Sequence, residues 1–295
     1  MMRRRLAAIV NPVSGRGGTA SVVRATGSVL RRFGAKLRLF TTTRPGHAAE
    51  IARGISCDVD AILAVGGDGT VSEIVNGLEG SRIPILILGT GTENVLAKYL
   101  RMPRDPNGVA DTLLNGQPRA CDVNLVNGRK FLAVAGVGFD AECVLRVSLE
   151  RRGHITHRDY FWPLWRTFWG HRFPRLRVSC DAEVVFEGRG LAILGGIPRY
   201  ALGMRILEGA WIDDGRLDVC IFACSSRLGL MNHAARVLAG RHLASKDVVY
   251  RQAAQVRIES PDRVPIEADG DYAGFLPATF TIMPNAAWFL QPHHA

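Results

Sequence analysis

The stretch that decides the fold is AILAVGGDGT, residues 61–70, in which an apolar run leads straight into a glycine-rich turn. Such an uninterrupted run is typical of a strand that is buried on both faces of a sheet. The glycines let the backbone approach a ligand closely, and the helix expected over 71–78 offers free N–H groups and the positive end of its dipole. Together these features favour a phosphate-binding turn.

Asp68, in the middle of this turn, does not fit simple phosphate binding, because like charges repel. A divalent cation beside the carboxylate, or a part in proton transfer, would make the residue favourable there. The alternative is structural: Asp68 would only cap the following helix in a tight turn. The turn alone does not separate these two interpretations.

Two loops of the same character follow apolar runs elsewhere in the first half. Asn-Pro-Val-Ser-Gly at 11–15 follows a strand expected over 6–10, and Gly-Thr-Gly-Thr-Glu-Asn at 89–94 follows one over 83–88. In a parallel sheet all three loops emerge at the carboxyl edge, where ligands of α/β proteins bind. None has the lysine of a Walker A loop, and the first lacks the GxGxxG of a dinucleotide-binding turn. They predict one ligand site of another kind.

The rest of the first half also alternates strands with helices. Helices are expected over 20–33 and 46–55, and a short strand over 37–40. Because each strand is a continuous apolar run, the pattern favours a parallel sheet covered by helices on both faces.

After about residue 118 the pattern changes, since strand-like segments follow one another with few helices between them. Helical spacing appears at 141–149 and 228–238. The strand-like segments are 131–135, 175–180, 183–187, 191–194, 217–222, 255–260 and 279–283. This half is typical of an antiparallel sandwich. We predict an α/β domain over 1–122 and a β-sandwich over 123–295, with the option that the last segment returns to the first domain.

Charge and cysteine content narrow the class of protein. The 295 residues carry 37 Lys and Arg against 27 Asp and Glu, a net charge of +10 that attracts nucleic acid, anionic lipid or phosphorylated substrates. No zinc-finger or helix-turn-helix pattern supports nucleic acid as the partner. The six cysteines are scattered without a CxxC pair, which favours reduced thiols in a cytosolic protein. No apolar run is long enough to span a membrane.

The ordered motifs resemble those of the diacylglycerol kinase catalytic family, which includes bacterial diacylglycerol kinases, sphingosine kinases and YegS-type lipid kinases. In the first half the resemblance rests on the three loops, Glu73 and the pair Asn76-Gly77. In the second half, GVGFDA at 136–141 is similar to the family's GxGFDA, and IDDGRLDV at 212–219 to its DDGxLDV. ADGD at 268–271 is similar to its DGE. The match covers nearly the whole chain.

The resemblance implies a nucleotide-binding α/β domain and a β-sandwich domain, with the active site in the cleft between them. It implies transfer of the γ-phosphoryl group of ATP to the hydroxyl of a lipid. The residues implied to bind the nucleotide are Asn11, Thr42, Gly66, Gly67, Asp68, Gly69, Thr70, Val71, Ser72, Glu73, Thr92 and Asn94.

For catalysis the resemblance implies that Asp269 or Asp271 is the general base that takes the proton of the attacking hydroxyl, with Asp68 as a further catalytic carboxylate. It also implies a Mg²⁺ ion near the DDGxLDV segment. The implied metal ligands are Asp214, the backbone carbonyls of Trp211 and Arg216, and Asp218, for which a structural ion pair is the alternative. Phosphoryl transfer depends on positioning and charge neutralisation more than on covalent chemistry, which agrees with these carboxylates.

Departures from the family pattern leave two rival interpretations open. Gly89 replaces a proline, Val95 an aspartate and Asp271 a glutamate, so a catalytically silent nucleotide- or lipid-binding module is one rival. An NAD kinase, which shares the GGDGT turn, is the other, although Glu73 and the GVGFDA segment favour the lipid kinases. The sequence does not identify the lipid.

A basic aromatic stretch, 151–177, suggests how a lipid would be reached. Phe161, Trp165, Phe168 and Trp169 fall on one face at helical spacing. Tryptophan with arginine is typical of a bilayer interface, so the stretch either docks on an anionic membrane or covers the sandwich as part of its core. We predict a cytoplasmic protein that is peripheral at the inner membrane face. An exposed strand edge in the second domain would suit a homodimer.

Overall fold

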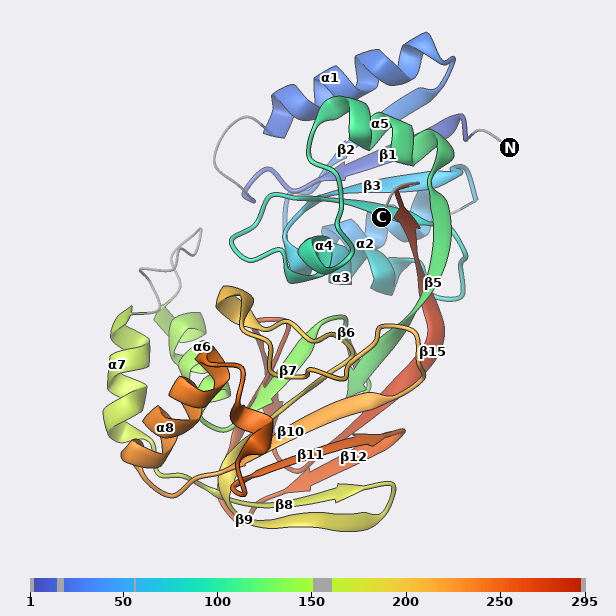
Figure 1. The fold of residues 1–295 in the computed structure, drawn as a ribbon. Helices are drawn as coiled ribbons and strands as arrows, with labels where there is room; N and C mark the ends of the chain where they lie inside the picture. Colours follow the sequence, from blue (N-terminus) through green and yellow to red (C-terminus); the bar gives the residue numbers. More distant parts are fainter. Residues whose placement is uncertain (1–2, 15–18, 56, 151–160, 293–295) are drawn as a thin grey trace. The chain divides into compact units, whose positions relative to one another are not determined.

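The computed structural model describes residues 3–14, 19–55, 57–150 and 161–292 (Figure 1). The chain divides into two compact units, Met1–Cys121 with Asn285–Ala295, and Asp122–Pro284. Strands β5 (Gln117–Val126) and β15 (Ala278–Gln291) each belong partly to both units. In the described part of the chain, no helix is long and apolar enough to cross a membrane.

The first unit is built on a parallel sheet, as its alternating pattern predicted. Its central strand β3 (Ala61–Gly66) is buried at every position, which a sheet covered on both faces requires. The end of β15 joins the same sheet, where Phe289 pairs with Ile85. From β3 outward the remaining strands are β4 (Ile85–Gly89) on one side, and β1 (Arg5–Val10) and then β2 (Lys36–Thr41) on the other.

Helix α3 (Asp68–Gly77) begins three residues before the predicted start at residue 71. Its N-cap is Gly67, which has an extended backbone with φ −89° and ψ −176°, so the glycine turn itself forms the first turn of the helix. The other helices of this unit are α1 (Thr19–Arg32), α2 (His47–Ile55), α4 (Val95–Tyr99) and α5 (Pro106–Asn115).

The second unit is an antiparallel sandwich, as predicted, and β9 (Glu183–Gly195) takes part in both of its sheets. The first half of β9 pairs with β8 (Arg175–Cys180), and its second half pairs with β7 (Val134–Val137) and β10 (Leu217–Ala223). The sequence predicted two separate strands here, over 183–187 and 191–194. Gly190 does not break the strand: a side chain there would collide with the carbonyl of Phe222 on β10.

The remaining elements complete the sandwich and cover it. Large apolar side chains such as Phe131, Phe280 and Ile221 are fully buried and belong to one core. The helices are α6 (Phe139–Glu150), α7 (Phe161–Gly170) and α8 (Arg227–Leu238). The other strands are β6 (Arg129–Phe131), β11 (Val248–Ala253), β12 (Gln255–Glu259), β13 (Pro265–Ala268) and β14 (Asp271–Phe275).

Residues 161–170 of the aromatic stretch form α7, and of the two alternatives left open for the stretch, burial in the core does not hold for its tryptophans. Trp162, Trp165 and Trp169 are each more than half exposed, whereas Phe173 just beyond the helix is buried. The buried face of α7, which packs against α6, carries small residues such as the fully buried Thr167, and the tryptophans lie on the outer face. Residues 151–160 of the stretch lie outside the described residues.

Candidate active site

Side-chain and backbone hydrogen bonds join the three glycine loops of the first unit. Asn11, after β1, donates from Nδ2 to Oγ1 of Thr70 at 3.0 Å. Thr90, after β4, donates from Oγ1 to Oγ of Ser14 at 3.1 Å, and its N–H donates to the carbonyl of Gly66 at 2.9 Å. The loops therefore meet at the carboxyl edge of the sheet, where the parallel topology predicted them. Gly15, the last residue of the first motif, lies outside the described residues.

Glycine is required where two of these loops touch. A Cβ atom on Gly91 would lie 2.8 Å from the Cα of Gly67, closer than side chains approach a backbone. A Cβ on Gly66 would collide with the side chain of Thr70, the residue that Asn11 holds. The close approach leaves the backbone N–H groups at the start of α3 in the loop cluster, and no side chain caps that helix.

Asp68 is a cap, but of a different helix from the one that the structural alternative named. Its carboxylate accepts the N–H groups of Val95 at 3.0 Å and Leu96 at 3.2 Å, at the start of α4. Burial raises the pKa of Asp68, although these two hydrogen bonds act in the opposite direction. Asp68 therefore ties the start of α3 to the loop after β4.

Glu73 and Thr42 lie beside the cluster rather than in its loops. The Glu73 carboxylate accepts the N–H groups of Gly46 at 2.9 Å and Ala48 at 3.1 Å, at the start of α2. Thr42 is buried directly after β2, and its N–H donates to the carbonyl of Val10 at 2.9 Å. Glu73 therefore fixes the segment that follows Thr42.

Asn94 holds the third loop in shape. It has a left-handed backbone with φ +50°, its Oδ1 accepts the N–H of Gly91 at 2.8 Å, and its Nδ2 donates to the carbonyl of Gly91 at 2.6 Å. A Cβ on Gly89 would lie 2.9 Å from the Cβ of Asn94, so glycine leaves room for the Asn94 side chain here. Of the other predicted nucleotide residues, Thr92 and Gly69 are exposed, Ser72 is half-buried and Val71 is buried, so Val71 offers only its backbone.

In the second unit, Asp269 is fixed by the backbone while Asp271 faces solvent. The Asp269 carboxylate accepts the N–H groups of Leu132 at 2.7 Å, Ala133 at 2.8 Å and Val134 at 3.3 Å. Asp271 begins β14, is exposed, and has one carboxylate oxygen 3.7 Å from Nη2 of Arg129. The two candidates for the general base thus differ in both exposure and rigidity.

A buried carboxyl pair next to Asp269 escaped the sequence analysis. Asp140 of the GVGFDA segment faces Glu267 of β13, and Glu267 also accepts the N–H of Gly270 at 2.9 Å. The glycine of the motif makes room for them, because a Cβ on Gly136 would collide with the Asp140 carboxylate. Burial, and then the charge of Asp140, hold the pKa of Glu267 well above its usual range, and burial also raises the pKa of Asp140.

Replacing Glu267 with glutamine is expected to flatten the pH dependence of stability. The folded chain keeps this carboxyl protonated where the unfolded chain releases its proton, so unfolding free energy falls as pH rises from about 4 through the raised pKa. Each proton retained in this way costs up to about 1.4 kcal/mol per pH unit. Glutamine can still accept from Gly270 and donate to Asp140. Denaturant unfolding at several pH values should show that Glu267→Gln gains unfolding free energy over the wild type and that this gain grows with pH. If the two plots of unfolding free energy against pH stay parallel, the pKa of Glu267 is not raised in the folded chain.

The predicted metal residues divide into two groups. Asp214 is exposed in a turn where its carboxylate accepts the N–H of Arg216 at 3.0 Å. Burial of part of the group, followed by the charges of Asp122 and Asp213, raises the pKa of Asp214. The buried Asp122, which the sequence analysis did not name, accepts the N–H of Gly215 at 2.7 Å in the same turn. No cluster of three metal-binding side chains occurs among the described residues.

The hydrogen bonds of Asp218 are to residues outside this turn. It is fully buried on β10, where its carboxylate accepts the hydroxyl of Tyr250 and, at 3.1 Å, Nε2 of Gln252. The predicted alternative for Asp218 was a structural ion pair, and the structure instead gives it neutral hydrogen-bond donors. Its oxygens are occupied within the sheet.

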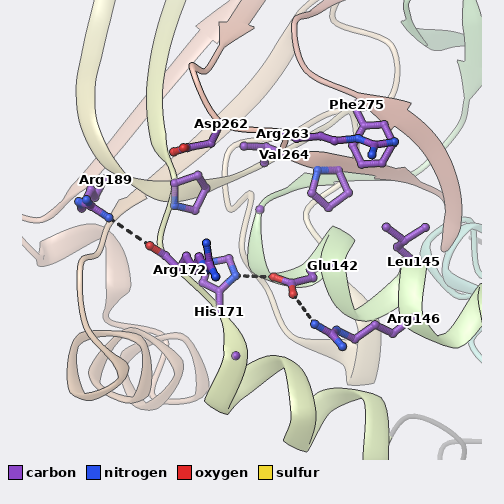
Figure 2. Close-up of a pocket in the computed structure, with 14 residues that line it drawn as sticks. Glu142, Leu145, Arg146, His171, Arg172, Arg189, Asp262, Arg263, Val264 and Phe275 are labelled. Carbon is purple, nitrogen blue, oxygen red and sulfur yellow. Dashed lines mark hydrogen bonds and ion pairs between the residues drawn. The ribbon is translucent and has the colours of Figure 1, made fainter.

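A cavity of about 720 Å³ lies within the second unit, beside α6 and the end of α7 (Figure 2). Glu142 lies at its wall, accepting from Nδ1 of His171 and from Nη2 of Arg146, each at 2.8 Å. Burial works to raise the pKa of Glu142, but these two partners outweigh it and lower the pKa. Arg172 and Arg189 add positive charge to the wall, so the cavity suits a ligand with an anionic or strongly polar group.

The α/β unit has an uncapped, glycine-lined helix start, and the sandwich carries carboxylates on its turns. These are the features of a phosphotransferase that takes its phosphoryl group from a nucleotide. Comparison with known proteins agrees. Residues 5–126 match the diacylglycerol kinase catalytic domain, and residues 133–290 match the YegS C-terminal NAD kinase beta sandwich-like domain. The chain therefore belongs to the diacylglycerol kinase family, as its motifs predicted, and is an ATP-dependent lipid kinase.

Named relatives cover nearly the whole chain at low identity. The diacylglycerol kinase of Bacillus subtilis (strain 168) is 28% identical over 288 residues, which are 95% of this chain and 93% of that protein. The diacylglycerol kinase of Mycobacterium tuberculosis (strain ATCC 25618 / H37Rv) is 28% identical over 298 residues, 98% and 96% of the two chains. A crystal structure of a diacylglycerol kinase from Bacillus anthracis str. Sterne has a TM-score of 0.74 at 19% identity, covering 99% of this chain and 98% of that one, and supports the fold.

Proposed function

We propose that the chain transfers the γ-phosphoryl group of MgATP to the hydroxyl of a diacylglycerol-type lipid. The acceptor class follows from the relatives, which are named diacylglycerol kinases. The observation that carries the proposal is the joining of three glycine-rich loops around the uncapped start of α3. Backbone N–H groups and a helix dipole at one point suit a polyphosphate.

In this proposal the backbone N–H groups from Gly67 to Gly69 hold the nucleotide phosphates, because those of Thr70 and Val71 donate to the carbonyl of Gly67. Asn11, Thr42 and Thr92 complete the nucleotide site with side-chain amide and hydroxyl groups. The remaining polar residues, Asp68, Glu73 and Asn94, position the loops, because their side chains already bond the backbone of neighbouring segments. Their contribution would be to hold the phosphate-binding N–H groups in one geometry.

Mg²⁺ fits the donor chemistry of the turn that contains Asp214. This ion takes one or two carboxylates and completes its shell with other oxygens and water. Asp214 has an exposed carboxylate whose pKa is raised by burial and by the charges of Asp122 and Asp213, and a cation would relieve that repulsion. The backbone carbonyls of Trp211 and Arg216 would be further ligands. Bound there, Mg²⁺ supplies neutralisation of negative charge. Asp218 is left out of this set because its carboxylate is occupied.

The proton of the acceptor hydroxyl passes to a carboxylate of the turn formed by Asp269, Gly270 and Asp271. As it leaves, the hydroxyl oxygen forms a bond to the γ-phosphorus and the bond from that phosphorus to the β,γ-bridging oxygen breaks, which releases ADP. We favour Asp269 as the base because, unlike the fully buried Asp218, it is partly exposed, and three backbone N–H groups hold its carboxylate in one place. Asp271 is half-exposed and paired with Arg129.

A lipid acceptor is held in a membrane, so we propose that the chain works as a peripheral protein on the cytoplasmic face of an anionic membrane. All six cysteines are free and five of them are buried, which suits a reducing compartment. The net charge of +10 favours approach to anionic lipid. The sequence also suggested a homodimer, and the molar mass measured by light scattering tests this.

A γ-phosphate transfer assay tests the acceptor. Radiolabelled MgATP is offered with diacylglycerol, a sphingoid base or NAD, and label is followed into the organic phase and into NAD. We expect label in diacylglycerol from the wild-type chain and a large loss with Asp68→Ala. Label in the sphingoid base alone would change the acceptor, label in NAD alone would support the NAD kinase interpretation, and no label despite nucleotide binding would indicate a silent module.

A further inference from the structure

Helix α7 presents a stripe of tryptophan to solvent. Trp162, Trp165 and Trp169 recur at intervals of three and four, so they lie on one face of the helix, and each is more than half exposed. The opposite face carries Pro163 and Thr167, which are buried. The helix thus has its larger apolar side chains outside and its smaller ones inside, which is the reverse of a helix that serves only to cover a core.

Helix α8 carries a second exposed apolar stripe, and Arg227 joins it to the first. Leu228, Met231 and Leu238 lie on one face of α8 and are exposed by 79%, 56% and 75%. Arg227 donates hydrogen bonds to the backbone carbonyls at the end of α7, and its guanidinium lies over the ring of Trp169. Both helices lie at the same end of the second unit (Figure 1). We call the six apolar side chains and Arg227 the α7–α8 surface.

The two segments that form this surface carry charge of one sign. Residues 161–177 contain four Arg and no Asp or Glu, and residues 224–246 contain three Arg and one Lys and again no Asp or Glu. Arg166 and Arg172 are exposed on or directly after α7, and Arg241 is exposed after α8. The two segments thus place arginines near the apolar side chains and contain no carboxylate that could pair with them.

We propose that the α7–α8 surface docks on a bilayer that contains anionic phospholipid, an inference that rests on the proposed lipid kinase function. Tryptophan rings are favoured at the depth of the headgroups, where leucine and methionine reach the acyl chains and arginine meets lipid phosphate. A large exposed apolar surface of this kind marks an interaction site.

Charge favours a bilayer over a second copy of the chain as the occupant. Two copies that met through this surface about a twofold axis would bring the same arginines together, without carboxylates from either segment to pair with them. An anionic bilayer supplies negative charge over the whole area instead. Gly170, the last residue of α7, also lines the cavity of Figure 2 together with His171 and Arg172, so the docked segment continues into that cavity wall.

The test compares Trp165→Glu and Met231→Glu with the matched control Phe33→Glu. Phe33 is an exposed aromatic residue of the first unit, 53% accessible, so its replacement repeats the chemistry away from the surface. Full-length proteins are sedimented with phosphatidylcholine vesicles with and without phosphatidylglycerol, at low and high salt. We expect each surface variant to lower the vesicle partition coefficient by about tenfold or more, with Phe33→Glu unchanged. Wild-type binding should require phosphatidylglycerol and weaken with salt.

Phosphoryl transfer from MgATP to a short-chain, water-soluble diacylglycerol, measured for each variant, separates this inference from the kinase function. The surface variants should keep wild-type kcat on this acceptor. Unchanged vesicle binding by both variants would overturn the docking surface, whatever their activity. Vesicle binding that is lost as expected, in a wild type that phosphorylates no lipid, would leave the surface standing and remove the proposed function. A wild-type dimer that both variants dissociate, with vesicle binding unaffected, would assign the surface to a second copy of the chain.

Discussion

Replacing Asp269 with asparagine is expected to lower kcat for lipid phosphorylation by about 10²–10⁴-fold, the usual contribution of a general base. The KM for MgATP should change little, because Asp269 belongs to the second unit and the nucleotide loops to the first. Stability should fall as well. The asparagine oxygen can keep the N–H groups of Ala133 and Val134, but its NH₂ group would face the N–H of Leu132. Loss of that charge-assisted bond costs about 1.5–3 kcal/mol.

Two further variants separate the chemical effect of Asp269 from the structural one. Asp181 is the matched control, since it also has a positive φ and accepts two backbone N–H groups, from Ala254 and Gln255, elsewhere in the second unit. Both of these N–H groups bond Oδ1 of Asp181, so Asp181→Ala is the variant that removes them; it should lower stability and leave kcat unchanged. Asp271→Asn should leave stability unchanged, because its contact with Arg129 is solvent-exposed. If kcat collapses in Asp271→Asn and survives in folded Asp269→Asn, the base is Asp271.

The sequence was sufficient for the carboxyl edge of the first unit. Continuous apolar strands implied a parallel sheet, and this topology alone required that loops far apart in the chain meet. The hydrogen bonds from Asn11 to Thr70 and from Thr90 to Ser14 show that they do. Local pattern worked here because each loop follows its strand directly, so position along the chain determines position in space.

What the sequence could not predict depends on partners that are distant in the chain. Glu267 reads as an ordinary strand residue, and its burial against Asp140 follows from the antiparallel pairing of β13 with β7. Asp122 was unremarkable until the turn of Asp214 was placed beside it. Helix α5 is different: Asp105 as N-cap and Pro106 at the first position mark its start in the sequence itself, although no helix was predicted there.

Asp68 has contacts that its motif does not specify. Its carboxylate was predicted to bind nucleotide and act in catalysis, yet in the structure both oxygens accept N–H groups of α4. Through these bonds it connects the turn after β3 to the loop after β4, which carries Thr92 and Asn94. We propose that Asp68 acts on the nucleotide through the geometry of these two loops rather than by contact.

Replacing Asp68 with alanine is therefore expected to lower kcat/KM for MgATP by about 10²–10³-fold, mainly through a rise in KM. Alanine leaves the N–H groups of Val95 and Leu96 without acceptors, at a cost of about 1–3 kcal/mol in stability. Nucleotide binding followed by calorimetry, alongside denaturant unfolding, measures both effects.

Asp60→Ala is the matched control for Asp68→Ala. Asp60 also accepts two backbone N–H groups, those of Arg4 and Arg5, each at 2.9 Å, but at the start of β1, the opposite edge of the parallel sheet from the loops. The Asp60→Ala variant should lose comparable stability and bind MgATP normally. If both variants weaken MgATP binding equally, the effect of Asp68 is general destabilisation. If only Asp68→Ala does, and Asp68→Asn recovers part of the affinity because its oxygen can accept one N–H group of α4, the role of Asp68 is to hold the loops together.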